Sequence, residues 1–243
     1  MAITSAPQRG GHTAHHSRLT LAAALISVLV LAGIGIAIAV LVHGGGSPGS
    51  GVQGSGVAAT QTRAVAPFSG LDLAGANDVT VTVGAPQSVV VHADSNLISR
   101  VTTRVAAGTL IIGDTGTFTT RAPMSVQVSV PALTALTLSG DGQISVTGIN
   151  TPQLTLTVSG SGLLKAAGTA VRLTVTLSGK GEAQLSQLTA RDVRAVVTGS
   201  GLIQVTATTS LDAAVPGTGA IIYGGNPPQV TTSVTGTGTV THR

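Results

Sequence analysis

The stretch LTLSGDGQISV, residues 136–146, returns in altered form as LTVSGSGLLKA from Leu156 and as VTLSGKGEAQL from Val175. Each copy begins with a segment in which apolar residues alternate with Thr or Ser. A Gly-x-Gly follows, and then a second segment in which apolar residues alternate with other residues. Six such pairs follow one another at spacings of 20, 19, 20, 18 and 19 residues: Gly140/Gly142, Gly160/Gly162, Gly179/Gly181, Gly199/Gly201, Gly217/Gly219 and Gly236/Gly238. A period near 20 residues with strand-like alternation predicts a solenoid, in which each repeat stacks on the previous one.

Alignment of the repeats on their first glycine brings apolar residues into columns. The column two residues before that glycine contains Leu138, Val158, Leu177, Val197, Val215 and Val234. The column four residues before it contains Leu136, Leu156, Val175, Ala195, Ala213 and Thr232. After the glycine pair, one column contains Ile144, Leu164, Ala183, Ile203, Ile221 and Val240. Thr and Ser separate many of these positions, which is the period-2 pattern of strands with one buried face.

The Gly-x-Gly is therefore predicted to be a corner between two strands of one coil. Glycine suits such a corner because it can adopt the positive φ of a sharp bend, and a second corner is expected near residues 148–152. Each coil advances the chain by ~4.8 Å, the spacing of hydrogen-bonded strands. The predicted fold is all-β, a parallel β-helix with six regular coils over residues 134–243. The same alignment places Arg172 opposite Asp192, and Arg194 opposite Asp212, in adjacent coils.

The N-terminal part has a different composition. Residues 19–42 contain no charged residue, and a helix of this length, ~36 Å, spans a bilayer core of ~30 Å. Arg9 and Arg18 precede it, so the positive-inside rule predicts a cytoplasmic tail over 1–18, a transmembrane helix over 19–42 and export of the remainder. Residues 43–65 are rich in Gly and Ser and are predicted to be a flexible linker to a β-helix domain over 66–243. The alternative is a signal peptide cleaved after Ala37-Ile38-Ala39, which would give a secreted protein.

The composition argues against several kinds of partner and site. Charged residues make up 8% of the chain and form no basic run, so nucleic-acid binding is not expected. The chain has no cysteine, which removes disulfides, thiolate metal sites and thiol nucleophiles. His12, His15 and His16 lie close together in the short tail, with no carboxylate beside them, and we predict no metal there. No catalytic residue and no cofactor are predicted.

The order of several sequence blocks resembles a known family. Phe68-Ser69-Gly70-Leu71 is followed by VTVTVG (79–84), SVVVHA (88–93), GTLIIG (108–113), VQVSVPAL (126–133) and then LSGDG. This order is similar to the bacterial putative auto-transporter adhesin head domain, also called the GIN domain, over about residues 66–243. The resemblance implies a right-handed parallel β-helix at the cell surface or in the envelope, and it defines no catalytic residues. Residues 66–133 lack the Gly-x-Gly period and are expected to form irregular first coils and a cap.

The predicted function is that of a membrane-anchored, exported, non-enzymatic module for adhesion, scaffolding or envelope binding. Its predicted partner is an envelope or cell-surface ligand, either a protein or a glycan, of unknown identity. The last coil ends in an unpaired strand edge, so self-association through the C-terminal coil is also expected.

Two other functions are alternatives. A β-helix enzyme that cleaves polysaccharides needs paired carboxylates in one groove, and the acids after residue 43 are Asp72, Asp78, Asp94, Asp114, Asp141, Glu182, Asp192 and Asp212. Convergence of two carboxylates from residues 72–141 in a pocket would favour this alternative. A crystal-face binder would use the ladder of Thr155 and Thr157 on Thr174 and Thr176, which the sequence interrupts at the next coil.

Overall fold

The computed structural model describes residues 51–243, and this part of the chain is all-β, with seventeen strands and no helix. The strands are β1 (Val52–Gln53), β2 (Ala58–Thr62), β3 (Gly70–Leu73), β4 (Asp78–Val83), β5 (Ser88–Asp94), β6 (Val101–Ala106), β7 (Thr109–Asp114), β8 (Phe118–Thr119), β9 (Ser125–Val130), β10 (Ala135–Leu138), β11 (Gln143–Val158), β12 (Leu163–Leu177), β13 (Glu182–Val197), β14 (Leu202–Val215), β15 (Ala220–Gly224), β16 (Gln229–Val234) and β17 (Thr239–His242). Within residues 51–243 there is thus no helix that would cross a bilayer. The predicted tail (1–18) and membrane helix (19–42) lie outside the described residues.

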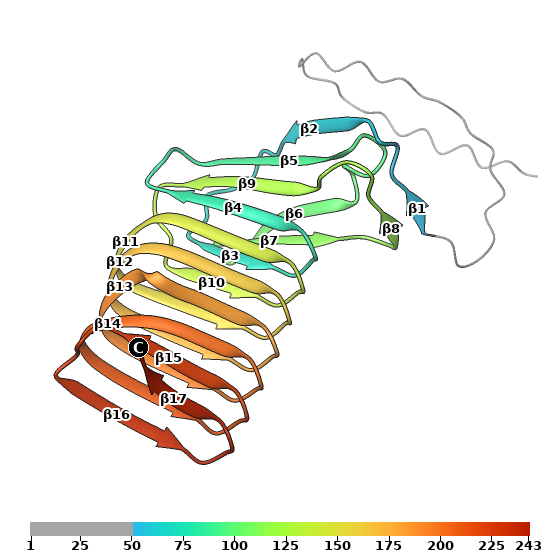
Figure 1. Ribbon diagram of the computed structural model, residues 1–243. Helices are drawn as coiled ribbons and strands as arrows, with labels where there is room; N and C mark the ends of the chain where they lie inside the picture. The colour runs from blue at the N-terminus through green and yellow to red at the C-terminus, as the bar shows by residue number, and fades with distance from the viewer. Residues whose placement is uncertain (1–50) are drawn as a thin grey trace, which may run out of the picture. The chain divides into compact units, whose positions relative to one another are not determined.

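Strands β10–β17 wind into a solenoid of about five turns, with successive coils in parallel register (Figure 1). Leu156 pairs with Val175, Val175 with Ala195 and Ala195 with Ala213, as the alignment predicts. The column that contains Leu138, Val158, Leu177 and Val197 is fully buried. The sequence predicts six regular coils, but the sixth consists only of the short strands β16 and β17. The parallel solenoid is confirmed, and its right-handed winding stays a prediction.

The structural reason for the Gly-x-Gly corners differs from the predicted one. None of these twelve glycines has a positive φ. A Cβ atom built on Gly160 would instead clash with the backbone carbonyl oxygen of Gly140 in the coil below, and one on Gly162 would clash with that of Gly142. The interstrand hydrogen bonds continue through the corner, for example from the Leu163 amide to the Gly142 carbonyl at 3.1 Å. Glycine is therefore required because the backbones of successive coils approach closely there.

The second corner lies inside the long strands β11 and β12. Gly148 and Gly168 have φ angles of 80° and 137°, which strain residues that carry a Cβ. The register between β11 and β12 shifts between Val146 and Ile149, and that between β12 and β13 shifts between Lys165 and Ala167. These β-bulges bend the strands without ending them. Positive-φ glycines therefore do occur in the solenoid, but at the second corner.

The N-terminal part contains a coil that the periodicity does not reveal. Strands β3 and β4 stack in parallel register on β10 and β11, with Leu71 opposite Leu136 and Val79 opposite Ile144. The corner of this coil is Gly75-Ala76-Asn77, which lies directly against Gly140 and Gly142. Strands β7 and β9 form the next layer, parallel to β3 and β4. Antiparallel strands then cover this end of the core, because β6 pairs with β7 and β5 with β9 (Figure 1).

The predicted linker over 43–65 is wrong in its second half. Strand β2 pairs in antiparallel register with β5, and β1 pairs with β8. The carboxylate of Asp94 is fully buried and accepts backbone N–H groups from Gly56, Arg121 and Ala122 at 2.6, 2.9 and 3.1 Å. Composition suggests a free tether, but these hydrogen bonds hold residues 54–62 against the cap.

The Asp94 contacts predict a pH-dependent contribution to stability. The Arg121 backbone N–H holds the pKa of Asp94 below its ordinary value, burial opposes this shift, and the N–H groups of Ala122 and Gly56 add to it. A carboxyl with a lowered folded-state pKa stabilises the fold above its unfolded pKa of about 3.9 and loses this contribution as the pH falls through the folded value. We expect Asp94→Asn to lower the denaturant midpoint at pH 7, with a difference from wild type that shrinks below about pH 3.9. An equal difference at neutral and acidic pH would contradict this assignment.

The two predicted charge pairs behave differently. Arg172 and Asp192 are register partners, as are Arg194 and Asp212. Arg194 Nη1 and Asp212 Oδ2 form a salt bridge of 2.6 Å, with side chains 63% and 47% exposed. Asp192 instead accepts a 2.8 Å hydrogen bond from Ser210 Oγ. The alignment is confirmed at both pairs, and a bridge this exposed contributes only about 0–1 kcal/mol.

Candidate functional site

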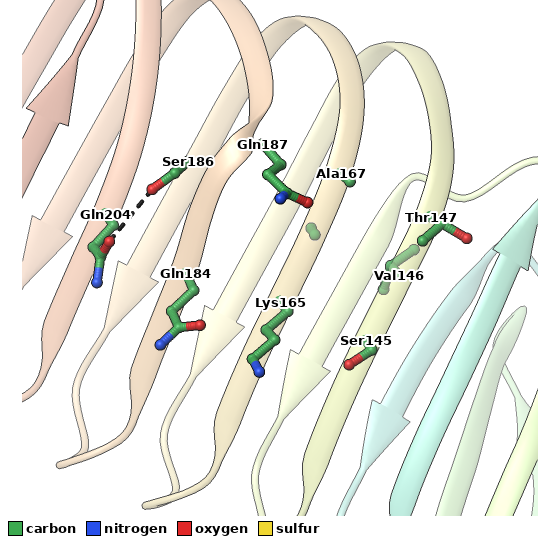
Figure 2. Close-up of a pocket in the computed structure, with 10 residues that line it drawn as sticks. Ser145, Val146, Thr147, Lys165, Ala167, Gln184, Ser186, Gln187 and Gln204 are labelled. Atoms are coloured by element: carbon green, nitrogen blue, oxygen red, sulfur yellow. Dashed lines mark hydrogen bonds between the residues drawn. The ribbon is translucent and has the colours of Figure 1, made fainter.

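The outward face of β11–β14 carries a row of polar side chains that runs along the solenoid axis. Ser145 pairs with Lys165, Lys165 with Gln184, and Gln184 with Gln204, in four successive strands. Figure 2 shows these four side chains projecting from the same face of neighbouring strands. Thr80 of β4 extends the row, opposite Ser145. The row is therefore a direct product of the coil register.

A hollow of about 510 Å³ lies along this row, and we call it the axial groove. Its polar lining is Ser145, Thr147, Lys165, Gln184, Ser186, Gln187 and Gln204. The strands bend beside it, where the register shifts next to Val146 and Lys165. Ala167 carries a small side chain at this bend and leaves the hollow open, whereas Ala166 is buried in the core. The β-bulges and Ala167 together therefore account for the groove.

A network of hydrogen bonds orients the amides in the groove. The carboxylate oxygen Oε1 of Glu182 accepts Nε2–H groups from Gln184 and Gln204 at 2.9 and 3.0 Å. Ser186 Oγ donates to Gln204 Oε1 at 3.3 Å, which is the dashed contact in Figure 2. These contacts link β13 to β14, so Gln184 and Gln204 have preferred orientations before any ligand arrives.

Lys165 is the cation of the axial groove. Its side chain is exposed, and it forms no salt bridge to any of residues 51–243. The one acid of the hydrogen-bond network described above, Glu182, already accepts two amide donors. The groove therefore combines oriented amides and hydroxyls with a cation that has no counter-ion in the described part of the protein.

A second hollow, of about 420 Å³, lies at the glycine corner and bears on the enzyme alternative. Asp78, Asp141, Glu182 and Lys180 line it. Two carboxylates from residues 72–141 therefore do meet, which is the condition set above. Both aspartates are exposed, however, and Asp141 accepts the Ser161 amide at 3.3 Å. A glycosidase also needs an acid kept protonated in a shielded, apolar place, and these exposed side chains do not provide one.

Other predicted features can also be placed. Thr155 pairs with Thr174 and Thr157 with Thr176, so the threonine ladder is real but reaches Arg194 and Val196 in the next coil. Residues 51–243 contain no group of three His, Asp or Glu side chains arranged to hold a metal ion. The tail histidines lie outside the described residues. Sequence reasoning predicted no site residue and so missed the axial groove, although the outward column Ser145, Lys165, Gln184 and Gln204 could have indicated it.

Comparisons with known proteins agree with this fold. A family model described as "Putative auto-transporter adhesin, head GIN domain" matches residues 67–227. A putative adhesin from Bacteroides fragilis NCTC 9343 has 23% identity and a TM-score of 0.67, over 79% of this chain and all of that chain. A putative lipid binding protein from Parabacteroides distasonis ATCC 8503 has 20% identity and a TM-score of 0.50, over 80% and 100%. A putative adhesin from Parabacteroides merdae ATCC 43184 has 19% identity and a TM-score of 0.50, over 79% and 98%. No curated protein matches the chain.

Proposed function

Because this chain belongs to the family of putative auto-transporter adhesin head GIN domains, we propose that it is a non-enzymatic binding module of the cell envelope, and that it binds its ligand through the axial groove. The observation that carries the proposal is the groove itself, which spans four coils and contains oriented amides and Lys165, a cation with no salt bridge within residues 51–243. Solenoids commonly bind extended partners along such surfaces because each coil repeats the same spacing.

We also propose that residues 19–42 anchor the module in the cell membrane, with the solenoid outside the cytoplasm. Support comes from the length and the uncharged composition of this segment, and from the arginines that precede it. The short cytoplasmic tail then leaves recognition to the exported part. In this arrangement the groove faces other components of the envelope.

One experiment with lipid vesicles tests both proposals. The full chain should float with vesicles after reconstitution and should bring purified envelope fragments with it. Ala167→Trp fills the groove beside Lys165 and should abolish capture of the fragments, whereas Thr155→Trp, on an exposed position of β11 outside the groove, should capture them normally. Loss of flotation would disprove the anchor, and normal capture by Ala167→Trp would disprove the role of the groove. Release of reducing ends from the fragments would favour the enzyme alternative.

We further propose that two copies associate through their last coils. Val230 and Val234 are 43% and 44% exposed, although Leu211 and Val215, their partners in the preceding coil, are buried. Antiparallel strands cover the opposite end of the solenoid, so a head-to-tail filament is disfavoured. A two-fold pair, in which β16 lies beside β16 of the second copy, would satisfy both strand edges.

This association predicts a dimer in sedimentation experiments on the full chain in detergent. Val234→Lys places a charge in the shared apolar surface and should shift the protein to monomer, while Thr231→Lys, on the outward side of β16, should leave the dimer intact. A wild-type protein that stays a monodisperse monomer at high concentration would contradict the proposal.

A further inference from the structure

The charge of the axial groove limits the chemistry of its ligand. The row Ser145, Lys165, Gln184 and Gln204 carries one positive charge and no negative one. Asp78, Asp141, Lys180 and Glu182 line the second hollow, at the glycine corner, and Glu182 is the acid that accepts the amides of Gln184 and Gln204. A ligand that follows the row therefore meets a single unpaired ammonium group. One isolated acidic group on the ligand is favoured, because a densely anionic polymer would be repelled by Asp78, Asp141 and Glu182, the three carboxylates of the second hollow.

The hydrogen-bonding groups of the groove match a hydroxylated ligand. Glu182 holds the Nε2 groups of Gln184 and Gln204. Within residues 51–243, Gln184 Oε1 and the side-chain amide of Gln187 form no hydrogen bond to another side chain. Figure 2 shows both side chains on the outward face of their strand. Amides and hydroxyls at successive coils recur every ~4.8 Å. Groups that both donate and accept at such intervals can pair with the ring hydroxyls of a glycan.

The structure disfavours a peptide and a nucleic acid in the same place. A peptide that binds by strand addition needs a free sheet edge, but neighbouring coils pair with β11–β14 on both sides. A peptide held by its side chains needs aromatic or aliphatic anchors in pockets, and no aromatic residue lines the groove. A nucleic acid requires several phosphate contacts, and the row provides only Lys165.

We infer that the axial groove binds a glycan that carries isolated carboxylate groups, with one carboxylate at Lys165 and sugar hydroxyls at Gln184, Gln187 and Ser145. This inference rests on the proposed function and gives its ligand a chemical class. The Lys165 ammonium supplies a charge-assisted hydrogen bond, and the amides and hydroxyls supply neutral ones, so the acid group contributes most of the discrimination between glycans.

Xylan oligomers that carry a single glucuronic acid residue, and the same oligomers with that acid methyl-esterified, provide the test, because the ester removes the charge but keeps the ring hydroxyls. The full chain in detergent micelles should bind the acid oligomer about tenfold more tightly than the ester, as expected for one charge-assisted hydrogen bond in a partly exposed groove. Lys165→Gln should weaken binding of the acid oligomer by about the same factor and leave binding of the ester unchanged. Added salt should weaken binding of the acid oligomer alone.

Arg191→Gln is the matched control. It removes the same charge from an exposed position of β13 that lines a different hollow, and it should leave both affinities unchanged. Equal binding of acid and ester by the wild type, or an acid affinity unaffected by Lys165→Gln, would overturn the inference. Absence of binding to either oligomer would also overturn it. After any of these three results, the proposed function would still stand if the vesicle-bound chain captured envelope fragments and Ala167→Trp abolished that capture.

Discussion

Gly160→Ala should cost about 3–5 kcal/mol of stability, one of the largest effects expected of any substitution in the chain. The added Cβ would clash with the carbonyl oxygens of Gly140 and Ser139 in the coil below. Both are backbone atoms within a continuous ladder, so relief requires the two coils to separate. Separation would break interstrand hydrogen bonds such as that from the Gly160 amide to the Leu138 carbonyl, at 3.3 Å. Denaturant unfolding of the full chain, monitored by far-UV circular dichroism, measures the loss.

Two controls separate the steric cause from a conformational one. Ser161 points outward between the two corner glycines, and Ser161→Ala should change stability by less than about 0.5 kcal/mol. Gly84 has a φ of 91° but no atom within 4 Å of a built Cβ, so Gly84→Ala should cost only the strain of a left-handed residue, about 1–2 kcal/mol. If Gly84→Ala were the more harmful variant, positive φ and not coil contact would limit the solenoid.

Periodicity predicts the regular coils well because each coil repeats the same physical constraint. The apolar columns of Leu138 and Ile144 are in the predicted register and are buried in every coil except the last. The cause of the glycine corners cannot be read in this way. The sequence does not distinguish a glycine that is required for a positive φ from a glycine that is required because two backbones approach closely. Only the backbone positions of Gly140 and Gly160 distinguish the two.

The first coils could not be predicted for a different reason. Strands β3 and β4 lie in register with β10 and β11, but residues 84–134 of the chain separate them from the coil on which they stack. Their corner, Gly75-Ala76-Asn77, keeps one glycine of the motif and lacks the second. Asp114 in the next layer accepts hydrogen bonds from the Ala76 amide and Asn77 Nδ2 at 3.1 and 2.8 Å. Long-range contacts of this kind replace the repeat, and they leave no period in the sequence.

The axial groove was partly predictable. The outward position three residues after the second glycine holds Ser145, Lys165, Gln184 and then Gln204, so a polar row follows from the alignment. The hollow itself does not, because it depends on β-bulges whose position varies between coils. The contact of Gln204 with Glu182 is diagonal, because Glu182 pairs with Leu202, two residues before Gln204 in β14. Irregularity within a repeat therefore creates the site.

Leu156→Ala should cost about 2–5 kcal/mol, the second large effect expected. Leu156 is fully buried and stacks between Leu136 and Val175 in the middle of the regular coils. Neighbouring coils are fixed by their hydrogen-bond ladders, so they cannot move inward to fill the space that the leucine leaves. Thr155→Ala, one residue away on the outward face, should change stability by less than about 0.5 kcal/mol. Denaturant midpoints of the three proteins give the comparison.

The position of a core residue along the solenoid should set the size of its effect. Val234 occupies the column of Leu138 but is 44% exposed, because β14 is the only strand within residues 51–243 that pairs with β16. Its replacement by Ala in the monomeric protein should therefore cost less than about 1 kcal/mol. Each coil contacts mainly its neighbours, so local opening can precede global unfolding. Hydrogen exchange should show Leu156→Ala accelerating exchange in β10–β12 and Val234→Ala only in β16 and β17. Uniform acceleration by both variants would mean that the solenoid unfolds as one unit.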